Sequence, residues 1–272
     1  MTDEIFKDLP YESPIQPLKL SVEDKIQFRC HPDIECFNQC CQCSDIQLTP
    51  YDILRLKNRF GLTSNQFLST YTIPFEMDSD GMPGVKILTK DNGACPFVEK
   101  NGCSVYEDRP SACRYYPIGL LSMREQDSST DEDHFFIVKE EHCLGHNESR
   151  ELTIAQYRQE QAIVEYDDIN REWRQIVLKK RSAGPGIGKP SMRSYQFFFL
   201  LSYNLDGFRE FIQTEGFSDV YEVSPETLKQ IDTDEIALLQ FGFKLLKQVL
   251  FGEVTIPIKE NALEKRKQRH QT

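Results

Sequence analysis

The stretch that decides the fold reads CPFVEKNGCSVYEDRPSACRYYP and spans residues 95–117. It contains three cysteines, Cys95, Cys103 and Cys113. The Glu-Lys-Asn-Gly segment at residues 99–102 predicts a tight turn, which would place Cys95 and Cys103 on one small hairpin. Thiols carried by short hairpins are typical of a small, irregular domain whose loops converge on a metal.

A second group of cysteines lies upstream, with five of them within fourteen residues. These are Cys30, Cys36, Cys40, Cys41 and Cys43. Cys143 completes a total of nine, all within the first 143 residues. The first residues lack a basic segment followed by an apolar one, so we expect no signal peptide and a cytoplasmic chain with reduced thiols. An odd, clustered set of thiols there indicates metal or redox chemistry rather than disulfides or packing alone.

The net charge and the apolar stretches of the chain limit the kinds of partner that it can bind. The 272 residues carry a net charge of −11, which makes the chain a poor general binder of nucleic acid or of anionic membranes. The basic stretch at residues 259–272 is the exception, and we interpret it as a solvated tail, with a contact to RNA or to an acidic protein as the alternative. The densest apolar stretch, residues 197–201, is too short to span a membrane.

Patterns of capping residues, apolar periodicity and turn signals predict an α+β fold. A small cysteine-rich metal-binding domain of short hairpins and helices is followed by an all-helical C-terminal region. The predicted parts are a leader at 1–27, the cysteine-cluster domain at 28–148, a helical domain at 149–258 and the tail at 259–272. Helices are expected at residues 50–60, 64–71, 153–181, 192–203, 206–214, 225–231 and 234–251, and strands at 84–90, 118–123 and 135–139.

Residues 28–56, residues 95–117 and the late Cys143 resemble the YkgJ-like cysteine-cluster family of proposed zinc- or iron-chelating proteins, of the CxxCxxCC type. The similarity covers residues 28–146, and the second block is the more specific. The first block departs from the family pattern. Its gaps of five and three residues are wider than usual, and Cys43 looks like an extra cysteine.

The resemblance implies that clustered thiolates hold zinc or an iron–sulfur cluster. Without Cys43, the predicted metal ligands are Cys30, Cys36, Cys40, Cys41, Cys95, Cys103, Cys113 and Cys143. Eight thiols suffice for two four-ligand sites, or for one site with spare cysteines. The spacing lacks the paired short knuckles of structural zinc sites, which favours an iron–sulfur cluster over zinc.

Two arginines flank Cys113 and are predicted to bind the cofactor. The guanidinium groups of Arg109 and Arg114 would offset the charge of packed thiolates and donate hydrogen bonds to sulfur. A structural ion pair with a neighbouring carboxylate is the alternative. The spacing of Cys143 and His146 would also suit a zinc pair, although a surface histidine is the commoner case.

Three functions remain open. The leading one is a metal-binding module that chelates an iron–sulfur cluster or zinc. The second is an iron–sulfur enzyme acting on a protein substrate, either a lysine N-methylase-like methyltransferase, as in one branch of the family, or an oxidoreductase. Against the methyltransferase, the sequence has no glycine-rich loop for S-adenosylmethionine. The third is an interaction protein with a purely structural metal. The catalytic residues, if any, are not apparent.

Overall fold

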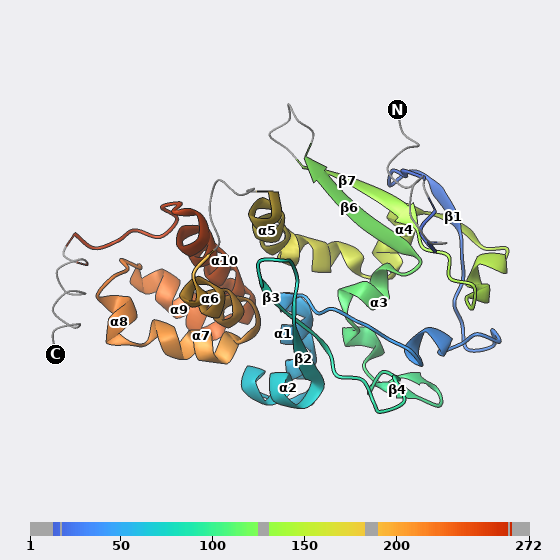
Figure 1. Cartoon of the computed structure of the whole chain (residues 1–272), viewed down its shortest axis with the longest axis horizontal. Helices are drawn as coiled ribbons and strands as arrows, with labels where there is room; N and C mark the ends of the chain where they lie inside the picture. The colour runs from blue at the N-terminus through green and yellow to red at the C-terminus, as the bar shows by residue number, and fades with distance from the viewer. Residues whose placement is uncertain (1–12, 17, 125–130, 183–189, 261, 263–272) are drawn as a thin grey trace. The chain divides into compact units, whose positions relative to one another are not determined.

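A computed structural model of the chain is shown in Figure 1. It describes residues 13–16, 18–124, 131–182, 190–260 and 262. The described chain divides into two compact units. Unit 1 comprises residues 1–46 and 89–166, and unit 2 comprises residues 47–88 and 167–272. Most of the predicted basic tail, at residues 261 and 263–272, lies outside the described residues.

Unit 1 consists of short strands and short helical turns. Its elements are β1 (Lys25–Gln27), η1 (Gln39–Cys41), β4 (Val98–Glu99), β5 (Gly102–Cys103), η2 (Tyr106–Asp108), α3 (Ser111–Tyr115), β6 (Ile118–Arg124), β7 (Asp131–Ile137), η3 (Leu144–Asn147), β8 (Glu151–Thr153), α4 (Ile154–Glu160) and the first turn of α5 (Ile163–Ser182). Three antiparallel pairs, β1–β8, β4–β5 and β6–β7, organise these elements. The β4–β5 hairpin confirms the turn predicted at residues 99–102, and β6 and β7 overlap the strands predicted at 118–123 and 135–139.

The core of unit 1 is one continuous apolar cluster. Its buried members are Leu20, Ile26, Phe28, Ile118, Phe135, Leu152, Ile154, Tyr157 and Ile163. Part of the expected leader therefore belongs to the folded unit. The amide of Leu20 donates to the carbonyl of Phe135 at 2.8 Å, and β1 pairs Ile26 with Leu152. The cysteine-bearing loops extend from this core.

The prediction of a single long helix from Thr153 to Arg181 is wrong, because the structure has two helices in this segment. α4 ends at Glu160 and α5 begins at Ile163, with Ala162 between them at φ 53°. A left-handed alanine costs roughly 1–2 kcal/mol. The break leaves the carbonyl of Gln161 outside the helical ladder, where it accepts a hydrogen bond from Arg114 at 2.8 Å.

Unit 2 combines one hairpin with helices from both parts of the chain. Its elements are α1 (Pro50–Phe60), α2 (Ser64–Tyr71), β2 (Thr72–Glu76), β3 (Pro83–Ile87), the rest of α5, α6 (Met192–Tyr203), α7 (Leu205–Ile212), α8 (Glu215–Ser218), α9 (Pro225–Thr233) and α10 (Glu235–Phe251). Residues 47–88, predicted within the cysteine domain, thus group with the C-terminal helices. Thr49 and Ser224 cap the N-termini of α1 and α9, the helices predicted at residues 50–60 and 225–231.

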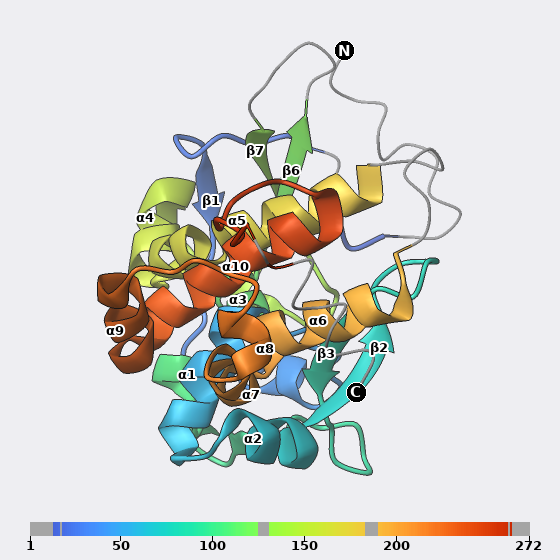
Figure 2. The same ribbon diagram turned by 90° about the vertical axis from the view of Figure 1, so that its left-hand side faces the viewer.

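The apolar core of unit 2 is centred on α10. This helix packs against α6, α7 and α9, as Figure 2 shows. Phe198 and Phe243 are fully buried, and the indole of Trp173 donates to the hydroxyl of Ser202 at 3.1 Å. A strand missed from the sequence, β2, pairs antiparallel with β3 and places Pro74 opposite Val85.

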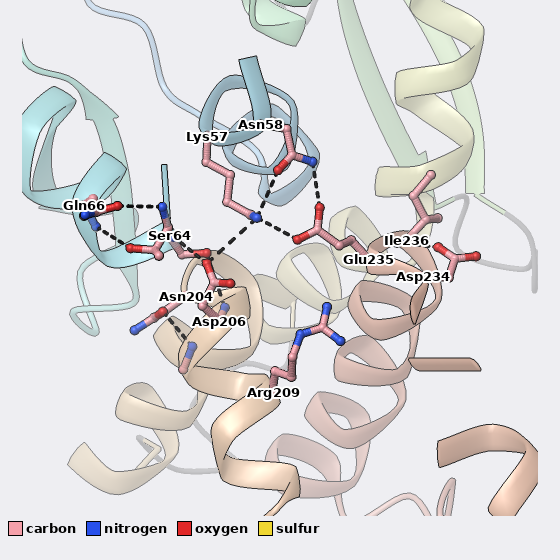
Figure 3. A network of polar contacts seen from close by, with 12 residues as sticks. Lys57, Asn58, Ser64, Gln66, Asn204, Asp206, Arg209, Asp234, Glu235 and Ile236 are labelled. Carbon is pink, nitrogen blue, oxygen red and sulfur yellow. Dashed lines mark hydrogen bonds and ion pairs between the residues drawn. The ribbon is translucent and has the colours of Figure 1, made fainter. Parts of the chain in front are cut away.

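A buried polar network ties four helices of unit 2 together (Figure 3). Nζ of Lys57, in the last turn of α1, donates to Oε1 of Glu235 at 2.6 Å and lies 3.8 Å from Oδ2 of Asp206. Asp206 in turn accepts the backbone amide of Ser64 at the start of α2. Both carboxylates lie in the first turns of their helices, where a negative charge is favourable.

Over the described residues, the helices are all too short or too polar to cross a membrane.

Candidate metal centre

All nine cysteines lie in unit 1, where backbone hydrogen bonds join the separate cysteine segments. The amide of Cys95 donates to the carbonyl of Cys41 at 2.8 Å, and the amide of Arg29 donates to the carbonyl of Gly145 at 3.1 Å. Figure 1 shows the blue segment with η1 beside the β4 hairpin. The upstream cysteine block therefore contacts both the 95–113 block and the loop of Cys143.

The adjacent pair Cys40–Cys41 lies in η1, and its two sulfur atoms are 3.9 Å apart. Asn38 precedes the pair at φ 66° and gives the chain a sharp bend, after which Cys40 is exposed and Cys41 is partly buried. Asparagine is one of the few residues that adopt this conformation readily. Sequence reasoning missed Asn38, although an asparagine two residues before a paired ligand was the available signal.

The second cysteine block is shaped by the predicted hairpin. β4 and β5 pair Val98 with Cys103, and the amide of Val98 turns back to the carbonyl of Cys95 at 3.3 Å. Cys113 follows on α3. One short stretch of chain therefore carries three of the predicted ligands on a tightly turned backbone.

The sulfur of Cys36 is a hydrogen-bond acceptor. The amide of Leu144, the residue after Cys143, donates to it at 3.2 Å. Amide donors to sulfur are the usual outer-shell support of thiolates in metal and iron–sulfur sites. The contact brings the loop of Cys143 to the first cysteine block.

Most of the thiols in this cluster hold their protons tightly. Partial burial raises the pKa of Cys30 to about 11, and the charges of Cys40, Cys143 and Cys36 add to the shift. Burial also raises the pKa values of Cys95 and Cys103, where neighbouring cysteines again contribute. These thiols are close enough for each charge to disfavour the next.

Cys40 is the exception. A hydrogen bond with the Cys41 thiol lowers the pKa of Cys40 to about 7, and the same hydrogen bond raises the pKa of Cys41. The charges of Cys113 and Cys95 also act on Cys41. Cys43, the extra cysteine of the sequence pattern, is exposed, and it is not among the leading causes of any of these shifts.

The two arginines hold the loop around Cys113. The buried Arg114 donates to the carbonyls of Arg109, Glu107 and Gln161, and its guanidinium stacks 4.1 Å from the ring centroid of Tyr166. Arg109 donates to the carbonyl of Tyr106 and to the side chain of Gln161. Its positive charge partly opposes the raised pKa of the Cys103 thiol.

The Tyr116 hydroxyl and the His146 ring are the polar side-chain groups described beside Cys143. Burial raises the pKa of the Cys143 thiol, and a contact with the Tyr116 hydroxyl partly opposes that shift. Nε2 of His146 is buried, and within the described chain it has no hydrogen-bond partner. The His146 ring packs edge-on against Phe28, with 5.2 Å between the ring centroids.

The donor chemistry of this region fits a soft metal ion or cluster. The nine thiols lie in one unit, and their thiolate forms would repel one another, which a bound cation would relieve. In the described residues, however, no three Cys, His, Asp or Glu side chains are already arranged to hold a metal ion.

These features define a cysteine-rich, metal-chelating class of domain. Residues 29–144 match the profile of the CxxCxxCC family, a proposed zinc- or iron-chelating domain. The match confirms the predicted cysteine-cluster resemblance and supports metal binding by cysteines. No curated protein and no solved structure gave a significant match to the chain.

Proposed function

We propose that this chain is a metalloprotein that holds an iron–sulfur cluster, or else zinc, through the thiolates of unit 1. The observation that carries the proposal is the gathering of eight cysteines from three chain segments, with charges that act on one another. The predicted ligands are Cys30, Cys36, Cys40, Cys41, Cys95, Cys103, Cys113 and Cys143.

The electrostatics explain why a metal suits this site. Without a cation, ionising several neighbouring thiols places like charges together in a partly buried region. A bound metal removes that penalty, because it stabilises each thiolate directly. The amide of Leu144 would donate a hydrogen bond to the Cys36 sulfur, and the guanidinium of Arg109 would stabilise the Cys103 thiolate. These two groups would not by themselves offset the negative charge of the remaining thiolates.

An iron–sulfur cluster is favoured over zinc because the cysteine gaps do not follow the short paired spacing of structural zinc knuckles. When bound, such a cluster supplies one-electron chemistry or structural cross-linking. The thiolates of the predicted ligands would hold the cluster.

The test is anaerobic purification followed by absorption spectroscopy and metal and sulfide analysis. We expect a brown protein that contains iron and acid-labile sulfide, whereas a colourless protein with zinc would favour the zinc form. A folded protein that contains no metal, and that takes up neither zinc nor iron with sulfide, would overturn the proposal. Replacing the extra Cys43 with serine is the matched control and should leave the metal content unchanged.

One observation favours an enzyme as the second candidate. Unit 2 contains an open cavity of about 630 Å³ whose charged lining residues are Glu222 and Lys244, with Phe241 on an apolar wall. A cavity of this size would accommodate a small molecule. A thermal-shift titration with S-adenosylmethionine tests the methyltransferase version, since a ligand that binds the folded state raises the melting temperature. No shift at saturating concentration would exclude that version.

A further inference from the structure

The open cavity of about 630 Å³ in unit 2 takes no part in the proposed metal binding. It is lined by the start of α9, by one face of α10 and by the extended segments that precede α9 and follow α10. The helices α9 and α10 pack against each other (Figure 2). All of the lining residues lie between positions 222 and 257, so the cavity belongs to unit 2 alone.

Hydrogen bonds fix the extended walls of this cavity. The amide of Glu222 donates to the carbonyl of Pro257 at 2.8 Å, so the two extended segments pair with each other. The hydroxyl of Thr255 donates to the carbonyl of Lys244 at 2.6 Å, which joins the second segment to α10. A ligand would therefore meet a surface that is already ordered, and an ordered surface lowers the entropic cost of binding.

Part of the cavity lining is apolar. Phe241 and Ile256 line the cavity, and both are almost fully buried in the fold. The ring of Phe241 stacks on Phe208 with 6.3 Å between the ring centroids, and it also meets Phe217 edge-on. Val223 adds a third apolar side chain to the lining. This surface favours a ligand that carries apolar groups.

Two charged side chains of opposite sign line the same cavity. Glu222 lies on an extended wall and Lys244 lies on α10, and both residues are exposed. Within the described chain, neither side chain forms an ion pair or a hydrogen bond. By contrast, Lys247 on the same helix pairs with Glu172 at 3.3 Å. The cavity therefore offers one positive and one negative group to a ligand.

We propose that this cavity binds a short zwitterionic peptide with apolar side chains. The carboxylate of the peptide would pair with Lys244 and its amino group with Glu222, while its side chains would lie against Phe241 and Ile256. A purely anionic ligand would be repelled by Glu222, and a purely apolar ligand would use neither charge. The site is independent of the metal in unit 1 and of the methyltransferase candidate.

The experiment measures the binding of the dipeptide leucyl-leucine to the full chain by equilibrium dialysis. Three analogues separate the contributions. The N-acetyl form lacks the positive end, the C-terminal amide lacks the negative end, and glycyl-glycine lacks the apolar side chains. We expect leucyl-leucine to bind more tightly than each analogue. Loss of one charged end should weaken binding about 3- to 10-fold, as for a charged contact that water partly screens.

Two variants assign each end of the peptide to one residue. Lys244→Met should bind leucyl-leucine and its amide equally, because the partner of the carboxylate is gone. Glu222→Gln should bind leucyl-leucine and its N-acetyl form equally. As controls, Glu226→Gln and Lys229→Met remove charges on α9 that do not line the cavity, and both should keep the preferences of the unaltered chain. All four positions are exposed, and circular dichroism checks the folding of each variant.

The proposal fails if the folded chain does not bind leucyl-leucine. It fails as well if the unaltered chain binds the acetylated or the amidated form as tightly as leucyl-leucine. Preferences that persist in Lys244→Met and in Glu222→Gln would also overturn it, since the peptide would then lie elsewhere. The metal content of the same preparation is measured separately, so failure of the peptide site and failure of the proposed metal-binding function are distinguishable.

Discussion

The backbone amide of Leu144 donates a hydrogen bond to the sulfur of Cys36, 108 residues upstream, at 3.2 Å. This contact links two cysteine segments through a backbone group, so it does not depend on the side chain at position 144. It also supplies the donor that a metal-bound thiolate needs at this sulfur. We therefore expect the amide, more than the leucine side chain, to matter for metal affinity.

Leu144→Pro tests this directly. Leu144 is the first residue of η3 and follows an extended Cys143, a position that proline tolerates, and proline lacks the amide hydrogen. We expect metal affinity to fall by about 10- to 100-fold, the usual effect of removing outer-shell support. Competition with a chromophoric chelator measures the affinity. Leu144→Ala keeps the amide and should stay close to the unaltered chain, and equal affinities for the two variants would contradict the prediction.

Metal affinity should rise with pH. The raised pKa values of Cys30, Cys95, Cys103 and Cys143 mean that these thiols are protonated at neutral pH, so a metal must displace their protons. Calorimetric titrations in two buffers of different ionisation enthalpy measure the protons released. We expect release of several protons at pH 7, and release from these four thiols should persist at pH 9, because their pKa values lie above the ordinary value of 9.0. Affinity that is independent of pH between 6 and 8 would contradict this.

The free energy of unfolding of the metal-free protein should fall as the pH rises, whereas the metal affinity should rise. For Cys30, the folded-state pKa of about 11 exceeds the ordinary value of 9.0, so the folded chain binds this proton more tightly than the unfolded chain. The resulting stability is complete below about pH 9 and is lost as the pH rises towards 11. Urea unfolding of chelator-treated protein across this range measures it, with Cys30→Ser as the control that should reduce the loss.

The cysteine hairpin and most helices could be predicted from local signals. Turn residues at 99–102 predicted the hairpin that carries Cys103 and follows Cys95, and the helix expected at residues 50–60 is α1. These features depend on neighbours in sequence. Removing Cys43 from the ligand set was also possible from spacing alone, although the ligand assignments themselves remain predictions.

Features that depend on distant contacts could not be predicted. Nothing in residues 160–163 breaks a helix, yet Ala162 adopts a positive φ. The freed carbonyl of Gln161 accepts a hydrogen bond from Arg114, 47 residues away. Proline is unfavourable inside a sheet, yet Pro74 lies in β2, which has a single partner, β3, within the described chain, and proline is tolerated on such an edge.

The network around Lys57 predicts a clear stability effect. Lys57→Met leaves Glu235 and Asp206 close together without their shared cation, in a region where both are about one-third exposed or less. We expect a loss of about 1–3 kcal/mol in the free energy of unfolding. Urea unfolding measures the loss. The exposed pair Lys25–Glu151 is the matched control, and Lys25→Met should cost less than about 1 kcal/mol. Equal effects would contradict a structural role for the network.

Arg109 and Arg114 should differ in what they do for the thiols. Arg109 lies close enough to lower the pKa of Cys103, so Arg109→Gln should raise that pKa, and Arg109→Lys should preserve it in part. Arg114 bonds backbone carbonyls with a rigid fork that lysine cannot reproduce, so Arg114→Lys should lower the free energy of unfolding by about 2 kcal/mol.

Alkylation of the metal-free protein at several pH values, followed by peptide mass analysis, measures the Cys103 pKa in each variant. Because Arg114 acts through the loop backbone, Arg114→Lys should change stability more than it changes this titration. Arg109→Gln should change the Cys103 titration more than it changes stability, since Arg109 donates to one carbonyl, that of Tyr106, and to the side chain of Gln161, whereas Arg114 donates to three carbonyls. If Arg109→Gln leaves the Cys103 titration unchanged, Arg109 does not act on the thiol, and its role is limited to holding the loop.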